Sequence, residues 1–208
     1  MVRRVRPAVL RKARQVRYEV PDNLFCFSHC YRGKYETAIQ AGLSDEAARR
    51  IVVGELPTYM WHAFEDVCRQ WFLWEDRGDR LDVAPLEVRR WWGTNPVERC
   101  EEEIDIVLSG VDGELILGEC KWNNRSVDAS VLGVLKRRAE LLPGGRDAQL
   151  FLFSKSGFER ERRQRALADG NVRLVDVGGD ALSGFDVPYV RCFWRGNCYV
   201  CVLLRVCE

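Results

Sequence analysis

The sequence has no long hydrophobic run, no P-loop motif for nucleotide binding and only two histidines, and each of these features marks a common class of protein. No apolar stretch approaches the ~20 residues of a membrane-spanning helix, so we expect no membrane partner. The basic first residues are not followed by an apolar segment, so no signal peptide is predicted and we expect a cytoplasmic protein. The pattern G-x-x-x-x-G-K-[ST] does not occur, which excludes nucleotide binding by a P-loop in this chain.

The two histidines, His29 and His62, are far in sequence from the acidic centre of the chain, so histidine-based catalysis is not expected. Cysteine is plentiful by contrast, with nine residues that we expect to be reduced in the absence of a secretory signal. Cys198 and Cys201 form a C-x-x-C pattern that could hold zinc. However, that segment is typical of a strand, where residues three apart point to opposite faces. We therefore expect no zinc.

Length and composition are those of a globular protein with one good core: 208 residues, 47% hydrophobic and 30% charged. The net charge is only +1, but the charges are segregated. Residues 1–17 carry seven basic and no acidic side chains, residues 136–165 carry nine basic and four acidic, and residues 98–105 carry one basic and five acidic. Basic flanks around an acidic centre fit a metal site within a polyanion-binding surface, although solvated helix faces would give similar runs.

Two short apolar segments, 103–108 and 115–122, are typical of strands and are separated by an Asp-Gly turn signal. Three charged residues interrupt them: Asp105 in the first segment, and Glu119 and Lys121 in the second. A lone carboxylate is costly to bury in an apolar strand. Such residues therefore usually lie where water, a metal ion or a cation reaches them.

The length of the turn decides which of these residues share a face, because side chains alternate along a strand. A two-residue turn would pair Asp105 with Cys120. A three-residue loop ending at Gly113 would instead pair Asp105 with Glu119 and put Lys121 on the same face, with Gly113 left-handed. We favour the longer loop, because two carboxylates beside an amine suit a divalent cation such as Mg²⁺. A β-bulge could produce the same grouping.

A helix is predicted over residues 58–75. Its predicted buried stripe comprises Met60, Phe64, Val67 and Trp71. Glu65 lies at the margin of this stripe, about 100° from its centre at 3.6 residues per turn. From there its carboxylate can reach a site beside the sheet; the alternative is a solvated helix carboxylate.

Periodicity and turn signals predict the remaining elements. The predicted strands are 86–92, 148–153 and 171–177, the predicted helices are 127–142 and 158–169, and a hairpin is predicted from segments 187–194 and 198–206. The basic segment 1–17 has weak helical spacing. In the helix 127–142, the side chains of Lys136, Arg137 and Arg138 are expected on or beside the outer face.

Five segments, in this order, resemble the PD-(D/E)XK nuclease core, whose signature is D-x(n)-E-x-K. The segments are Tyr59–Glu65, Arg90–Trp92, Glu103–Val107, Gly118–Trp122 and Phe153–Phe158. The signature itself falls on Asp105, Glu119 and Lys121. With these flanks the chain resembles the nuclease-like domain at the C-terminus of archaeal-type P-loop ATPases, a domain family largely of unknown function.

The resemblance implies an α/β, restriction-endonuclease-like fold with an α-β-β-β-α-β core and a mixed central sheet flanked by helices. The nuclease-like core would occupy 57–180, after a basic and helical extension over 1–56. Residues 181–208, with the predicted C-terminal β-hairpin, do not match the family and could pair on a sheet edge or form an oligomer contact. The chain would correspond to the C-terminal part of such an ATPase, either alone or as a fragment.

The resemblance also implies a metal-dependent endonuclease that hydrolyses DNA phosphodiester bonds. Asp105 and Glu119 would bind Mg²⁺ or Mn²⁺, Glu65 would complete the metal site, and Lys121 would orient or help to deprotonate the attacking water. The alternatives are a non-catalytic DNA-binding or regulatory module of an ATPase system, and a plain structural domain with a salt-bridged cluster.

The basic segments would hold the DNA backbone without reading its sequence. The residues expected to do so are Lys155, Arg160, Arg162, Arg163 and Arg165. Besides DNA, the expected partners are a P-loop ATPase and a second copy of the chain in a homodimer.

Overall fold

In the computed structural model of the protein, a helix that begins at Leu56 is followed by three strands, a second helix and two further strands among the described residues. The structure describes residues 2–9, 15–75, 81, 83–128, 130–159 and 169–176. These residues form two compact units: one contains 2–5 and 17–63, and the other contains 6–9, 15–16 and the described residues from 64 to 176. The hairpin predicted within 181–208 and most of the helix predicted over 158–169 lie outside the described residues.

The first unit contains a small hairpin in which β1 (Arg3–Val5) pairs antiparallel with β2 (Arg17–Glu19). Arg3 forms an ion pair with Glu19 across the two strands at 3.2 Å. The weak helical spacing of 1–17 is therefore misleading for the residues of β1 and β2. Their backbone N–H and C=O groups are satisfied by pairing between the two strands and not within a helix.

The helices of the first unit begin with α1 (Asn23–Gln40), where the Asp22 carboxylate accepts a hydrogen bond from the backbone N–H of Phe25 at 2.9 Å. After a turn, α2 (Ser44–Arg50), the π-helical η1 (Ile51–Glu55) and α3 (Leu56–Glu75) follow without a break. The Tyr31 hydroxyl donates to the backbone carbonyl of Glu55 at 3.3 Å, which satisfies a carbonyl group of the π-helical turn.

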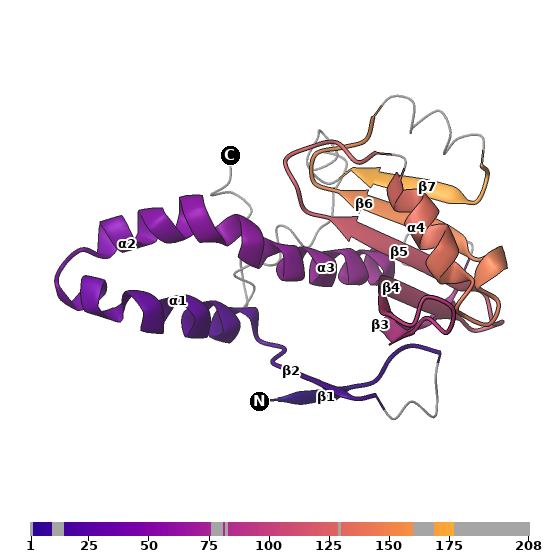
Figure 1. Cartoon of the computed structure of the whole chain (residues 1–208), viewed down its shortest axis with the longest axis horizontal. Helices are drawn as coiled ribbons and strands as arrows, with labels where there is room; N and C mark the ends of the chain where they lie inside the picture. Colours follow the sequence, from indigo (N-terminus) through magenta and orange to yellow (C-terminus); the bar gives the residue numbers. More distant parts are fainter. Residues whose placement is uncertain are drawn as a thin grey trace. The chain divides into compact units, whose positions relative to one another are not determined.

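The second unit is built on a mixed sheet of five strands in the order β3-β4-β5-β6-β7 (Figure 1). The strands are β3 (Pro85–Thr94), β4 (Glu101–Gly110), β5 (Leu115–Lys121), β6 (Gln149–Ser154) and β7 (Val172–Asp176). The first three pair antiparallel and the last three parallel. Helix α4 (Ser130–Ala139) and the 3₁₀ turn η3 (Gly145–Asp147) connect β5 to β6. The order α3-β3-β4-β5-α4-β6 confirms the predicted α-β-β-β-α-β plan.

The sheet is buried on both faces. On one face, Leu132 and Leu135 of α4 pack with Leu117 of β5 and their neighbours. On the other, Phe64 and Phe72 of α3 belong to a second cluster that includes Ile116, Cys120, Phe151 and Phe153. Parallel strands covered on both faces are expected to be apolar throughout, as β6 is.

Two helices differ in detail from the prediction. In α3, Cys68 and Phe72 are buried, whereas Val67 and Trp71 are only partly buried, so the buried stripe is rotated from the predicted one. Helix α4 begins at Ser130, whose backbone N–H donates to the Asp128 carboxylate at 2.7 Å. The predicted start at Val127 is wrong because Val127 forms a β-bridge with Phe158.

Candidate functional site

The hairpin of β4 and β5 sets the geometry of the site. The strands pair through Ile106–Gly118 at one end and Ser109–Leu115 at the other, which confirms the three-residue loop. Gly113 in this loop has φ +93°, the left-handed conformation that was expected. One step beyond the last pair, this register places Asp105 opposite Glu119.

A β-bulge lies at Asp105. The pairing of β3 with β4 shifts register between Arg89 and Trp91, so Asp105 and Ile106 of β4 both lie opposite Arg90 of β3. Bulges bend a strand and re-aim its side chains, and they are frequent beside functional sites. The sequence alone named a bulge only as a second way to gather the carboxylates.

Beyond the Ile106–Gly118 pair, a hydrogen bond from a side chain replaces the backbone pairing of β4 with β5. The Asp105 carboxylate accepts a hydrogen bond from the backbone N–H of Cys120 at 2.8 Å. Asp105 is only 9% exposed. Burial raises its pKa to about 7, helped by the charges of Glu119 and Glu65, while the Cys120 N–H and Lys121 oppose the rise. The three predicted carboxylates are therefore close enough for their charges to interact.

Glu65 reaches this cluster from α3 and is 3% exposed, so it is not a solvated helix carboxylate. Its Oε2 lies 2.9 Å from Nη2 of Arg90 and 3.6 Å from Nη1 of Arg69. Arg69 Nη1 also donates to the backbone carbonyl of Asp105 at 3.1 Å. Arg69 thus joins α3 to the bulged residue of β4, and neither arginine was singled out from the sequence.

Glu119 is held by two cations. Lys121 Nζ lies 2.8 Å from its Oε1, so the two residues share a face of β5. Nη1 of Arg138 lies 3.2 Å from Oε2 and 3.4 Å from Oε1 of the same carboxylate. Arg138 lies beside the outer face of α4, within the expected range, but its side chain turns toward the sheet because buried carboxylates attract it there. Lys136 of the same helix pairs with Asp169 at 2.9 Å.

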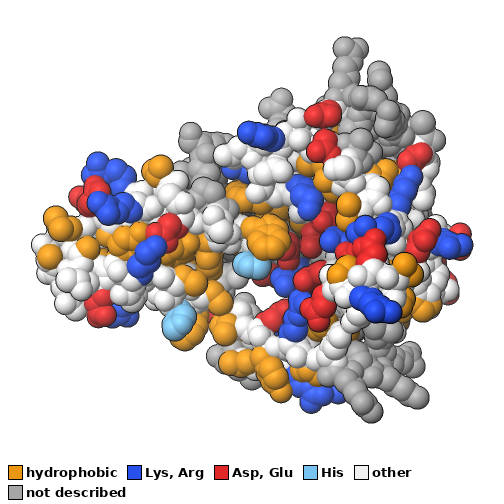
Figure 2. Space-filling model, viewed as in Figure 1, with side chains coloured by type: hydrophobic (Ala, Val, Ile, Leu, Met, Phe, Trp, Pro, Cys, Tyr) orange, Lys and Arg blue, Asp and Glu red, His pale blue; other side chains and the backbone are white. Residues whose placement is uncertain are grey.

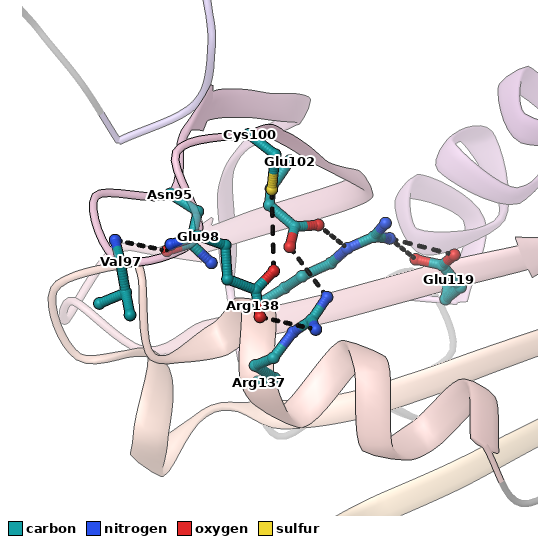
Figure 3. A network of polar contacts seen from close by, with 8 residues as sticks. All are labelled: Asn95, Val97, Glu98, Cys100, Glu102, Glu119, Arg137 and Arg138. Atoms are coloured by element: carbon teal, nitrogen blue, oxygen red, sulfur yellow. Dashed lines mark hydrogen bonds and ion pairs between the residues drawn. The ribbon is translucent and has the colours of Figure 1, made fainter.

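A chain of ion pairs continues from Glu119 away from the site (Figure 3). Nε of Arg138 donates to Glu102 Oε2 at 2.8 Å, Nη2 of Arg137 donates to Glu102 Oε1 at 2.9 Å, and Nη1 of Arg137 donates to Glu98 at 3.1 Å. Burial opposes the charge of Glu102, but Arg138 and Arg137 outweigh it and lower its pKa.

Sequence reasoning missed this network, although one signal was present. Arg138 follows Leu135 by three residues and precedes Leu142 by four, so it borders the buried stripe of α4. A cation at that position either snorkels to solvent or meets a buried carboxylate. The choice could not be made without knowing that Glu102 and Glu119 lie beneath the helix.

The donor set of Glu65, Asp105 and Glu119 fits Mg²⁺ or Mn²⁺ in its chemistry, since all ligand atoms would be hard carboxylate oxygens. In this structure the charges of Glu65 and Glu119 are balanced by arginine and lysine side chains. A different group of the described residues has its possible ligand atoms closest together. The ligand atoms of Glu98, Cys100 and Glu102 all lie within 4.8 Å of one another. Arg137 and Arg138 already engage the two carboxylates of that group.

Of the predicted DNA-binding residues, Lys155 lies in the loop after β6. Its Nζ lies 4.6 Å from the ring centroid of Trp122 and donates to Asn124 Oδ1 at 3.1 Å, which joins this loop to the one after β5. The other four residues, Arg160, Arg162, Arg163 and Arg165, lie outside the described residues. On the face shown in Figure 2, acidic and basic side chains of the described residues lie intermingled.

The fold and site thus define an α/β protein with an acidic cluster on the interior strands β4 and β5 of a mixed sheet. Residues 30–132 match the model of a family described as archaea bacterial proteins of unknown function (DUF234), and Glu65, Asp105, Glu119 and Lys121 lie within the match. The uncharacterized protein MJECL04 of Methanocaldococcus jannaschii is 25% identical over 114 residues. The aligned part is 54% of this chain and 24% of that protein.

No solved structure matches the chain. None of the helices within the described ranges is long and apolar enough to cross a membrane.

Proposed function

We propose that the protein is a metal-dependent nuclease of the PD-(D/E)XK type that hydrolyses phosphodiester bonds of DNA. One observation carries the proposal: the bulge at Asp105 and the β4–β5 register gather Asp105, Glu119 and Glu65 closely enough to shift the pKa of Asp105. Buried carboxylates that crowd together need cations to offset their repulsion, and a divalent metal ion is a cation that several carboxylates can share. The order of charged residues, D-x(n)-E-x-K, is that of the nuclease signature.

In this proposal, Asp105 and Glu119 hold Mg²⁺ or Mn²⁺ and Glu65 completes the site. The bound ion supplies a water of lowered pKa and neutralises charge on the scissile phosphate. Lys121, on the same face as Glu119, donates to the attacking water or to a phosphate oxygen as negative charge develops there. Catalysis would then depend on the amine of Lys121 mainly in the transition state, since the metal and not the lysine positions the substrate.

The resemblance suggests that the protein acts with larger partners. The aligned part of this chain spans about a quarter of MJECL04, so a related protein can carry much larger additional parts. We propose that a P-loop ATPase, on another chain or on a further part of this one, moves or remodels the DNA. A homodimer formed through residues 181–208 is a further proposal.

A second function is a non-catalytic DNA-binding or regulatory module of an ATPase system. It is favoured by the ion pairs at the site, because Glu65 and Glu119 are each balanced by cations of the protein itself. Under this alternative the ion pairs between carboxylates and arginines would stabilise the packing of the helices on the sheet. Lys155 and the basic segment after β6 would bind DNA.

Incubation of purified protein with single-stranded, duplex and branched DNA tests the choice. The proposed nuclease cuts at least one form with Mn²⁺ or Mg²⁺, EDTA stops it, and Lys121→Ala has lost the activity. Cutting that survives Lys121→Ala would come from a contaminating nuclease. DNA binding that falls with salt but is never followed by cutting would support the regulatory module.

A further inference from the structure

Arg138 stands out among the cations of the site because it contacts both oxygens of one predicted metal ligand. Its Nη1 lies 3.2 and 3.4 Å from the two carboxylate oxygens of Glu119. This Nη1 lies between the two oxygens, on the side from which a metal ion would bind both of them, and Lys121 also engages Oε1. A divalent cation that binds Glu119 through both oxygens therefore has to replace Arg138.

We propose that Arg138 is an exchangeable cation that couples metal binding to DNA binding. It neutralises Glu119 in the metal-free protein, yields that carboxylate to a divalent cation, and then donates to a phosphate of the nucleic acid. The inference rests on the proposed function for the identity of the polyanion. The exchange at Glu119 rests only on the contacts of Arg138.

A second contact keeps Arg138 beside the site when Glu119 is released. Its Nε donates to Glu102 Oε2 at 2.8 Å, and Glu102 is itself 5% exposed and held by Arg137 through its other oxygen (Figure 3). Only Nη1 of Arg138 contacts Glu119, so this end of the group can change partner while Nε stays on Glu102. The Arg138 side chain is 21% exposed, which leaves it a path to an incoming phosphate. Arginine suits this exchange because its planar donors match carboxylate and phosphate oxygens equally well.

The balance of charge explains why the two ligands should reinforce each other. Glu119 already has two cations within ion-pair distance, Lys121 and Arg138. A divalent ion that binds Glu119 alone adds positive charge beside both of them, which costs free energy at short range. A phosphate that draws Arg138 away removes this cost. By linkage, metal must then tighten DNA binding as much as DNA tightens metal binding.

The test compares Arg138→Gln with Arg137→Gln. Arg137 is the matched control, because it is the neighbouring arginine on α4 and pairs with Glu102 and Glu98 but forms no hydrogen bond or ion pair with Glu119 in the described part of the chain. Isothermal titration calorimetry measures the dissociation constant of Mn²⁺ with and without a short phosphorothioate DNA duplex, which keeps its negative charge and resists cleavage. Wild-type protein should bind Mn²⁺ about tenfold more tightly with the duplex, within the range usual for coupled sites.

Arg138→Gln should bind Mn²⁺ about tenfold more tightly than wild type without DNA, and the duplex should add little. Arg137→Gln should behave like wild type. Circular dichroism checks that Arg138→Gln is folded. If the folded variant binds Mn²⁺ no more tightly than wild type does, Arg138 only stabilises the structure and the proposal is overturned.

Should Arg138→Gln fail to fold, the wild-type titrations decide: a duplex that leaves the Mn²⁺ dissociation constant unchanged overturns the coupling. The proposed nuclease function can fail separately. If no DNA form is cut with any metal, but Arg138→Gln still gains Mn²⁺ affinity, the exchange at Glu119 stands and the nuclease does not.

Discussion

The Asp105 carboxylate accepts a hydrogen bond from the backbone N–H of Cys120 at 2.8 Å, across the point where β4 and β5 stop pairing. Cys120 lies between Glu119 and Lys121, so this bond fixes the bulged residue of β4 against the segment that carries the other two signature residues. The bond favours the charged form of Asp105, but burial and the neighbouring carboxylates outweigh it and raise the pKa to about 7.

The first prediction concerns stability and pH. The folded protein keeps a proton on Asp105 up to about pH 7, whereas the unfolded chain loses it near pH 4. The folded state therefore binds more protons in this window, and the Asp105 contribution to the free energy of unfolding is lost as pH rises from about 4 to about 7. Asp105→Asn, whose amide oxygen can still accept from Cys120, should remove this loss and be the more stable protein at pH 8.

Urea unfolding of both proteins between pH 4 and pH 8 measures this difference. Glu102 contributes in the opposite direction, because its lowered pKa gives stability that is lost as pH falls. That contribution is common to both proteins and cancels in the comparison. A difference in unfolding free energy that does not change with pH would contradict a raised pKa at Asp105.

The second prediction concerns Gly118, where a Cβ would lie 3.0 Å from Ile106 Cβ, next to the bulge. Gly118→Ala should destabilise the protein by about 1–3 kcal/mol, because the buried Ile106 side chain must shift. Gly133→Ala on the exposed side of α4 is the control, since a Cβ there has nothing within 4 Å. It should stabilise the helix by roughly 0.5–1 kcal/mol. Equal effects of the two changes in thermal unfolding would argue against the close approach of β4 and β5.

The third prediction concerns metal ions and the melting temperature. A cation that binds the folded protein stabilises it by about 2.7 kcal/mol at a hundred times its dissociation constant. Mg²⁺ and Mn²⁺ should therefore raise the melting temperature of wild type more than that of Asp105→Ala. A melting temperature that stays constant across millimolar concentrations of both ions, with and without DNA, would contradict a metal site at these carboxylates.

The sequence was sufficient to predict the hairpin, because its signals are local. The Asp-Gly turn and the alternation of charged with apolar residues predict the hairpin but leave two registers open. The longer loop is preferred because it puts Asp105, Glu119 and Lys121 on one face, and the structure has that register. The order of helices and strands was predictable for the same reason, since each element from 56 to 154 has its own periodicity and turn signals.

The contacts between distant elements were not predictable in this way. Arg138 on α4 and Glu102 on β4 look like ordinary surface charges in the sequence, and only the packing of the helix on the sheet turns them toward each other. The bulge at Asp105 is likewise invisible, because it depends on the pairing of β4 with β3 and not on the residues of β4 alone.

The fourth prediction separates the residues of the site from the residues that hold DNA. Neutralising Arg160, Arg162, Arg163 and Arg165 should weaken binding to all DNA sequences alike and flatten its dependence on salt, because these residues are expected to contact phosphates only. Fluorescence anisotropy at several salt concentrations measures both effects. Unchanged affinity and salt slope would contradict a role of this segment in binding.

The most direct test of the central claim is DNA cleavage by wild type, Asp105→Ala and Lys121→Ala in Mn²⁺, with DNA affinity measured on the same samples. The proposed nuclease predicts cutting by wild type alone, because Asp105 serves the metal and Lys121 the transition state. After EDTA is added, DNA affinity should be nearly equal for all three proteins; in Mn²⁺, Asp105→Ala alone should lose the part of the affinity that the coupled metal contributes. Cutting by wild type should also stop with EDTA. No cutting of any DNA form by wild type with any metal would contradict the account, as would equal cutting by all three proteins, since that activity would come from a contaminating nuclease.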